Sequence, residues 1–342
     1  MEPSLERPKP QSILAIMEEM NRQVLGAEFD TLLPTPTGFD PMDRYLGGGV
    51  RPGELVVISG AQGVGKTTMA FQIARNIAAA RCGYCLFLCY EHDSGYLLSR
   101  LISLESLDPH YGDGDRGLRQ IDFQKAILTS RSQERIGLHG ILLKDWRASA
   151  VVQKIRAYGE RLRLLKGSGT NTDLPAIADL VRDAKASGLL PLTLFVDYLQ
   201  KIALYPEPAG ENEKITRVTE GLKELALAEG IPIVAISAAE KEGLQAKRLR
   251  LHHVRGSSAL AYESDIILVL NDKYHIVSKS SIEHNPYKAQ GYKDWVVCSI
   301  EKNRSGIDGV DLQFRKRFEF CCFDPNGDLV TDKLIDDRLY AE

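Results

Sequence analysis

The sequence predicts an α/β protein built on a mostly parallel sheet in three layers, and three observations carry this prediction. Short apolar runs alternate with helical patterns through most of the chain. Most of these runs are continuously apolar, which is typical of strands covered on both faces. One run leads directly into a glycine-rich phosphate motif that opens a helix. The expected strands are residues 55–58, 85–89, 192–196, 231–236, 266–270 and 295–300, and the expected helices are residues 66–80, 94–104, 173–185 and 213–229.

The two ends of the chain are expected to depart from this alternation. Apolar residues at spacings of three and four predict an amphipathic helix over residues 13–25, within an N-terminal helical arm and linker. Strand-like runs near the other end, joined by short turns, predict antiparallel strands at one edge of the sheet. The expected division is an arm over residues 1–32, one domain over residues 33–325 with insertions around 108–190 and 275–293, and a C-terminal tail over residues 326–342; the late runs are residues 310–314 and 318–323.

Composition narrows the class of protein further. The chain has 342 residues, with 43 Lys and Arg against 46 Asp and Glu, for a formal charge of −3. This is not the basic signature of a protein that grips nucleic acid over its whole surface, so any such contact must come from a local patch. The sequence lacks both a long apolar run and an apolar start, so we expect a cytoplasmic protein without a membrane partner.

The cysteines of the chain suit a reducing compartment. There are six of them, and Cys82 and Cys85 form a C-G-Y-C sequence that could belong to a metal site. No second pair follows at zinc spacing, and Cys85 and Cys89 lie in an apolar run that reads as a buried strand. We therefore expect these thiols to be small buried side chains, without a structural metal.

The phosphate motif is the most specific feature of the sequence. Residues 60–67 read G-A-Q-G-V-G-K-T and match G-x-x-x-x-G-K-[ST], between an expected strand and an expected helix. Its backbone N–H groups and helix N-terminus favour an anion, its lysine reaches phosphate oxygens, and its threonine hydroxyl can hold Mg²⁺. The nucleotide-binding residues are Gly60, Ala61, Gln62, Gly63, Val64, Gly65, Lys66, Thr67 and Thr68.

Two carboxylates at neighbouring strand ends are expected to complete this site. Asp197 ends the strand 192–196 and is the candidate to hold Mg²⁺ together with Thr67. Glu91 follows the strand 85–89, so in a parallel sheet it lies on the same edge as the phosphate loop and can act as general base. A second interpretation of Glu91 stays open, in which it is a capping acid of the following helix near Asp93.

These motifs together resemble the motor domain of DnaB-type replicative helicases, within the RecA-like superfamily of P-loop NTPases. The resemblance begins at P-T-G-F-D-P-M-D (residues 36–43), continues through R-P-G-E-L (51–55) and F-V-D-Y-L-Q (195–200), and covers residues 33–323. Residues 302–306, K-N-R-S-G, are also close to the K-N-R-x-G element of RadA/Sms-type ATPases. KaiC-like ATPases share the same ring architecture.

The resemblance implies an ATPase that uses ATP and Mg²⁺ and assembles into a homo-oligomeric ring, with a hexamer expected. Lys66 and Glu91 are then catalytic, and Ser237 belongs to the sensor strand. Lys302 and Arg304 are the cations that such rings insert into the active site of a neighbouring subunit. The family glutamine after the sensor serine is Ala238 here. Residues 1–32 stand where DnaB proteins carry a larger helical domain, so recruitment by a protein partner and docking of the arm onto a neighbouring subunit are expected.

Two functions remain open from the sequence. The resemblance places the loop after the sensor strand in the central channel, where its basic residues can track single-stranded DNA; a solvated charged loop is the alternative. The first function is a ring-forming motor of the DnaB type that acts on single-stranded DNA. The second is a KaiC-like regulatory or assembly ATPase that acts on a protein partner without unwinding. The candidate nucleic-acid residues are Lys241, Lys247, Arg248, Arg250 and Arg255.

Overall fold

The computed structural model describes residues 10–26, 33–107, 117–131, 136–240, 246–277 and 290–335. The chain divides into two compact units, Met1–Leu33 and Pro34–Glu342. The first unit contains α1 (Ile13–Leu25), the helix that the sequence predicts, and none of its residues is buried. The Ser12 hydroxyl begins this helix by accepting a hydrogen bond from the Ala15 N–H at 3.1 Å.

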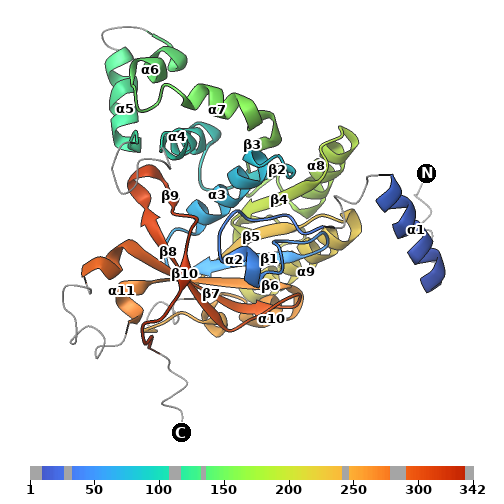
Figure 1. The fold of residues 1–342 in the computed structure, drawn as a ribbon. Helices are drawn as coiled ribbons and strands as arrows, with labels where there is room; N and C mark the ends of the chain where they lie inside the picture. Colours follow the sequence, from blue (N-terminus) through green and yellow to red (C-terminus); the bar gives the residue numbers. More distant parts are fainter. Residues whose placement is uncertain are drawn as a thin grey trace. The chain divides into compact units, whose positions relative to one another are not determined.

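The second unit is built on one sheet, which has ten strands within the described residues (Figure 1). Its order is β10-β8-β7-β6-β1-β5-β4-β2-β3, with β9 paired to β8. The strands from β3 to β6 in this order are parallel, and β7 and β8 add the predicted antiparallel pairs. Of the expected strand 318–323 only β9 forms, because residues 318–320 are a 3₁₀ helix, and the antiparallel β10 was not predicted. The strands are β1 (Leu55–Gly60), β2 (Tyr84–Cys89), β3 (Leu162–Lys166), β4 (Leu192–Asp197), β5 (Ile233–Ala238), β6 (Ile266–Asp272), β7 (Trp295–Asn303), β8 (Val310–Arg317), β9 (Cys322–Phe323) and β10 (Asp328–Leu329).

Helices cover both faces of this sheet, which gives the three predicted layers. Successive residues of β1 point into two separate cores because side chains alternate along a strand. Val56 and Ile58 pack with α3 and α4, whereas Leu55 and Val57 pack with α8 and α9. Burial on both faces explains why the residues of β1 and β4 are mostly apolar and are buried without a break. The covering helices are α3 (Lys66–Ala79), α4 (Ser94–Glu105), α8 (Leu174–Ala186) and α9 (Glu211–Glu229).

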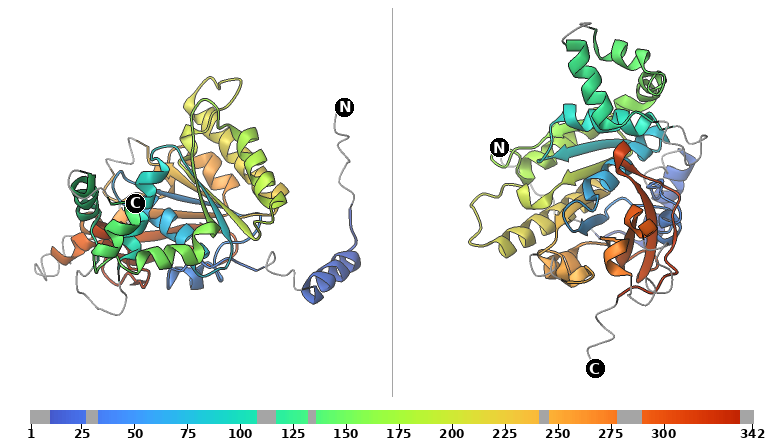
Figure 2. Two further views of the ribbon diagram at one scale, coloured as in Figure 1. Left: turned by 90° about the horizontal axis from the view of Figure 1, so that it is seen from above. Right: turned by 90° about the vertical axis from the view of Figure 1, so that its left-hand side faces the viewer.

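Residues 108–190 contribute more to the sheet than an insertion would. β3 pairs with β2, and α8 covers one face. The apolar pattern does not predict β3 because an edge strand alternates, and Arg163 and Lys166 are exposed. Within the described part of residues 108–190, α5 and α6 stand apart from the layers, and they share a small core with α4 and α7 (Figure 2). These helices are α5 (Gln120–Thr129), α6 (Leu138–Lys144) and α7 (Val151–Tyr158).

The start of the expected C-terminal tail belongs to the second unit. β10 pairs with β8, and Asp332 accepts hydrogen bonds from the buried Lys273 at 2.5 Å and from the Tyr292 hydroxyl at 2.8 Å. Residues 278–289 of the second expected insertion and residues 336–342 of the tail lie outside the described part of the chain. The remaining short helices are α2 (Met42–Tyr45), α10 (Ser257–Glu263), α11 (Lys273–Ile276), and the 3₁₀ helices η4 (Gly159–Arg161), η5 (Leu199–Lys201), η7 (Leu251–His253), η8 (Tyr292–Asp294) and η9 (Phe318–Phe320).

A largely buried ion pair between α4 and α3 also binds α7. Glu105 of α4, 1% exposed, takes a bidentate contact from Arg75 of α3 at 2.5 and 2.8 Å. The Tyr158 hydroxyl of α7 donates to the same carboxylate at 2.5 Å. Because α3 also carries the end of the phosphate loop, this carboxylate links α7 to the phosphate-binding helix.

Replacing Glu105 should therefore destabilise the protein strongly. In Glu105→Ala the Arg75 guanidinium, 26% exposed, and the buried Tyr158 hydroxyl both lose their partner, and we expect a loss of about 3 kcal/mol in the free energy of unfolding. Chemical denaturation measures this loss. Glu160→Ala is the control, because Glu160 is 88% exposed in its pair with Arg163 and should change stability by about 0.5 kcal/mol or less. Equal losses in the two variants would contradict this role of Glu105.

Candidate nucleotide site

The phosphate loop runs from the end of β1 to the first turn of α3. Gly63 and Gly65 have φ of 79° and 105°, where L side chains are strained. A Cβ at Gly65 would also lie 2.5 Å from the Phe323 ring and 2.7 Å from the Phe318 ring. The loop therefore needs glycine at position 65 both for its backbone conformation and for its close packing against the β8–β9 region.

Lys66 lies across this loop. Its Nζ donates to the Gly60 and Ala61 carbonyl oxygens, each at 2.9 Å. Burial lowers the pKa of Lys66, and the nearby Asp197 and Glu91 carboxylates oppose that shift. An ammonium group held inside a glycine loop, at a helix N-terminus, is suited to bind phosphate oxygens.

Thr67 and Asp197 meet at the base of the site. The Thr67 Oγ1 donates to Asp197 Oδ2 at 2.9 Å, although the two residues are far apart in the sequence. Asp197 is 1% exposed, and burial raises its pKa to about 6 while the Thr67 hydrogen bond opposes the shift. A buried carboxylate beside a hydroxyl is an oxygen donor pair of the kind that Mg²⁺ prefers.

One cleft of about 620 Å³ collects most of the predicted nucleotide residues. Glu91 lines this cleft, and Asp93 is the residue that caps α4, since its carboxylate accepts the Tyr96 N–H at 2.8 Å. This arrangement favours the catalytic interpretation of Glu91 over the capping interpretation. Val64 is buried in the core instead, and Ala61 lines a different cavity. The predicted residues in the cleft are Gly60, Gln62, Gly63, Gly65, Lys66, Thr67, Thr68, Glu91 and Asp197.

Ser237 lies behind the cleft wall and is fully buried. The Gln200 side chain donates to Ser237 Oγ at 2.9 Å and accepts from the Ala238 N–H at 3.4 Å. Gln200 was not among the predicted site residues, although it follows Asp197 in the same F-V-D-Y-L-Q run. Gln200 of η5 thus contacts the sensor strand β5 at Ser237 and at Ala238, the position where the resemblance led us to expect a glutamine.

Arg100 lines the cleft and was not predicted from the sequence. It lies on α4, contacts the Thr68 hydroxyl, and stacks its guanidinium over the Tyr96 ring at 6.0 Å. Both side chains reach the cleft because residues four apart share one face of a helix. That spacing, directly after Glu91, is the signal that could have identified Arg100 as a cation near the phosphates.

Lys302 and Arg304 lie away from the cleft of their own chain. Arg304 pairs with Asp265 at 3.2 Å, and Asp265 accepts the N–H of Leu55, the first residue of β1, at 2.8 Å. The phosphate loop follows the opposite end of β1. Since a strand of this length spans roughly 17–20 Å, these cations cannot reach a nucleotide bound in their own cleft.

The five basic residues of the candidate nucleic-acid loop differ in their surroundings. Arg248 is 4% exposed and pairs with Asp311 at 2.5 Å, so its expected place in an open channel needs correction: this charge is already neutralised inside the unit. Arg250 pairs with Glu301 at 3.0 Å and Arg255 with Glu211 at 2.8 Å. Lys247 is exposed, and Lys241 lies outside the described residues.

The described residues contain no group of three or more His, Cys, Asp or Glu side chains arranged to hold a metal ion. The cysteines are free thiols, and burial raises the pKa of Cys89 to about 11. In the same part of the chain, no helix is long and apolar enough to cross a membrane.

Fold and site together define a P-loop nucleotide-binding protein with a RecA-like sheet. Residues 35–321 match the family described as "DnaB-like helicase C terminal domain", and the chain belongs to this family. The resemblance stated from the sequence is therefore confirmed, and family membership favours the helicase motor over the KaiC-like alternative.

Curated relatives agree with this assignment. The chain is 23% identical to the replicative DNA helicase DnaB of Rickettsia bellii, over 84% of the chain and 57% of that protein. It is 25% identical to the DnaB of Geobacillus stearothermophilus, over 83% of the chain and 55% of that protein. The chain spans a little over half the length of these curated relatives.

Solved structures share the fold. The structure of a DnaB-like replicative helicase, described together with its interactions with primase, matches with a TM-score of 0.65 at 18% identity. The match covers 92% of this chain and 67% of that one. An isolated ATPase domain matches with a TM-score of 0.69 at 19% identity, covering 92% of this chain and 99% of that one. The second unit therefore has the fold of such ATPase domains.

Replacing Asp197 should separate stability from nucleotide chemistry. Its pKa of about 6 exceeds the ordinary 3.8, so the ionised form disfavours the folded state and stability falls as pH rises between these values. We expect Asp197→Asn to stabilise the protein without nucleotide at pH 7 by on the order of 1–3 kcal/mol. Thermal unfolding at pH 5 and pH 7 measures this gain, which should shrink at the lower pH.

The same Asp197→Asn variant should lose Mg²⁺-dependent ATP turnover. Thr67→Val is the matched control, because it removes the hydroxyl from the same pair and leaves the buried carboxylate in place. It should lose turnover without any gain in stability. A variant Asp197→Asn that is less stable than the parent at pH 7 would contradict the electrostatic argument.

Proposed function

We propose that this protein is an ATP-hydrolysing, ring-forming motor of the DnaB type that acts on single-stranded DNA. The observation that carries the proposal is the division of the site between the two ends of β1. The cleft has Lys66, Thr67, Asp197 and Glu91 at one end, and the cations Lys302 and Arg304 lie at the other. Lys302 and Arg304 can then act only on a nucleotide bound by a second subunit, so full hydrolysis depends on assembly.

The residues of the cleft fit ATP and Mg²⁺. Residues 60–68 would hold the phosphates through the glycine-loop N–H groups and Lys66, and Thr67 with Asp197 would hold Mg²⁺. When bound, Mg²⁺ neutralises charge on the phosphates. Glu91 would accept the proton of the attacking water, and Arg100 would add positive charge on the α4 side. Ser237 and Gln200 would connect the sensor strand to the end of β4.

The proposed DNA contact is limited to the loop after β5. Lys247 and Arg255 would face the channel of a hexamer, repeated in every subunit, and Lys241 is proposed to bind DNA with them. Arg248 and Arg250 are left out because their pairs with Asp311 and with the 7% exposed Glu301 already neutralise them. A contact confined to this loop agrees with a chain of formal charge −3, in which the basic residues that meet DNA are few. We further propose that the apolar face of α1 docks on a neighbouring subunit, and that a protein partner recruits the ring.

Single-stranded DNA should stimulate ATP turnover several-fold at low salt, and the stimulation should fade as salt rises because phosphate contacts are electrostatic. ATPase assays with and without DNA measure this. Lys66→Ala should abolish turnover under all conditions. Lys247→Ala should reduce the stimulation without changing turnover in the absence of DNA, and Arg163→Ala, on the edge strand β3, is its control. Absence of stimulation at low salt would favour the KaiC-like alternative, an ATPase that acts on a protein partner.

Arg304→Ala should bind ATP normally and lose turnover, because the neighbouring nucleotide loses its cation. Removal of such a group is expected to lower turnover by about 10³-fold or more. Fluorescent nucleotide titration and steady-state ATPase assays separate the two effects. Full turnover in Arg304→Ala would contradict the assignment of this residue.

A further inference from the structure

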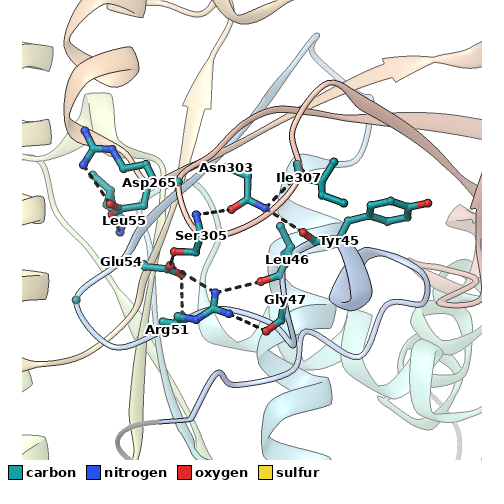
Figure 3. Close-up of polar contacts among 12 residues, drawn as sticks. Tyr45, Leu46, Gly47, Arg51, Glu54, Leu55, Asp265, Asn303, Ser305 and Ile307 are labelled. Atoms are coloured by element: carbon teal, nitrogen blue, oxygen red, sulfur yellow. Dashed lines mark hydrogen bonds and ion pairs between the residues drawn. The ribbon is translucent and has the colours of Figure 1, made fainter.

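Residues 302–306, which we call the cationic turn, are docked against the segment that leads into β1 (Figure 3). Asn303 is 7% exposed, and its Nδ2 donates to the Tyr45 carbonyl oxygen at 3.0 Å. Its Oδ1 accepts the Ser305 N–H at 3.1 Å. A Cβ at Gly306 would lie 2.5 Å from the same Tyr45 oxygen, so the turn fits this segment only with glycine there.

Glu54 is the anchor on the other side of this contact. Its carboxylate is nearly buried and accepts the Ser305 hydroxyl at 2.7 Å and the Arg51 N–H at 2.8 Å. The Arg51 guanidinium in turn donates to the Leu46 and Gly47 carbonyl oxygens at 3.1 and 2.7 Å. The Ser305 hydroxyl therefore binds a group that is itself held at several points.

The two cations of the turn point the other way, toward the end of α10. Lys302 Nζ donates to the Ala261 and Ser264 carbonyl oxygens at 2.6 and 2.5 Å. Arg304 contacts the Asp265 carboxylate and the Tyr262 carbonyl oxygen, while its backbone N–H donates to the Asp265 carbonyl oxygen at 2.9 Å. Lys302 and Asn303 point to opposite sides because side chains alternate along β7, and the turn at Arg304 and Ser305 keeps the same division.

The Arg304 side chain nevertheless remains 48% exposed. When its guanidinium leaves Asp265, that carboxylate keeps the hydrogen bonds from Lys223 and the Leu55 N–H, whereas the Cα of Arg304 is fixed by the backbone hydrogen bond and by the anchors on both flanking residues. A long side chain on a fixed base reaches a neighbouring phosphate with little further ordering. Placement at this level matters, because a displacement of about 1 Å can lower a rate about 10²-fold.

We propose that Asn303, Ser305 and Glu54 are positioning residues for Arg304. Through Arg304 they act on the nucleotide bound by the next copy of this chain. The inference rests on the proposed function, because it needs a ring in which Arg304 reaches a neighbouring site. The uncharged residues of K-N-R-S-G then hold the turn so that Lys302 and Arg304 reach the neighbouring nucleotide together.

Ser305→Ala tests this proposal with the smallest change. The variant loses the hydroxyl bound to Glu54, and we expect turnover at saturating ATP to fall about 10- to 100-fold, with ATP affinity within about twofold and an unchanged melting temperature. Ser305→Thr, which keeps the hydroxyl at an exposed position, is the matched control and should retain turnover. Asn303→Ala is the second variant and should show the same split between turnover and affinity.

Mixed rings show whether the defect acts on a neighbour. Lys66→Ala subunits cannot turn over ATP but carry an intact cationic turn. Adding them in excess to Ser305→Ala subunits should raise turnover per Ser305→Ala subunit, as it should for Arg304→Ala.

No rescue, or a melting temperature that falls with activity, would overturn the proposal and leave only a structural role. Normal turnover in Ser305→Ala with an inactive Arg304→Ala would overturn it while the proposed function stands. Normal turnover in Arg304→Ala would instead overturn the proposed function.

Discussion

The buried carboxylate of Asp265 is the contact on which the arrangement of the site depends. It is 6% exposed, and it accepts hydrogen bonds from the Leu55 N–H at 2.8 Å and from Lys223 of α9 at 2.7 Å. A buried charge is tolerated only when several partners compensate it, and Arg304 is the third. One carboxylate thus ties together the beginning of β1, a helix on one face of the sheet, and the turn that carries the cations.

β1 is the strand that joins the two halves of the proposed reaction. Its last residue begins the phosphate loop, and its first residue is bound to Asp265. A displacement of the strand therefore moves both the phosphate loop and the contact with Asp265. Protein interiors are densely packed and transmit such displacements instead of absorbing them. In the proposed ring, the nucleotide of one subunit and the cations offered to the next would therefore be connected through one buried strand. Such a connection would be a physical reason for the ring to hydrolyse ATP in a coordinated way.

The sequence predicts those parts of the fold and site whose signal is local. Buried parallel strands are continuously apolar, and the phosphate loop has a fixed pattern of glycine, lysine and threonine, so both could be placed from residues alone. β3 was missed because an edge strand carries Arg163 and Lys166 among its leucines. Arg248 was misjudged and Gln200 was missed for another reason. The burial of Arg248 against Asp311, and the contact of Gln200 with Ser237, depend on residues distant in the sequence. Tertiary pairing of this kind leaves no periodic pattern to detect.

The basic residues of the loop after β5 differ in the free energy that it costs to break their ion pairs. Each pair must break before its cation can bind a phosphate backbone. The Arg255–Glu211 pair is 28% and 57% exposed, and pairs of this kind contribute about 0–1 kcal/mol, so Arg255 can exchange its partner readily. Arg250 is held by a Glu301 that is 7% exposed, and Arg248 is itself 4% exposed, so breaking either pair leaves a poorly solvated charge. On the proposed function, contact with DNA would begin at the exposed Lys247 and at the half-buried Arg255, while Arg248 and Arg250 hold the base of the loop against β7 and β8. An overall charge of −3 is compatible with a DNA motor on this basis, because residues that shape the loop and residues that bind the phosphates are separate.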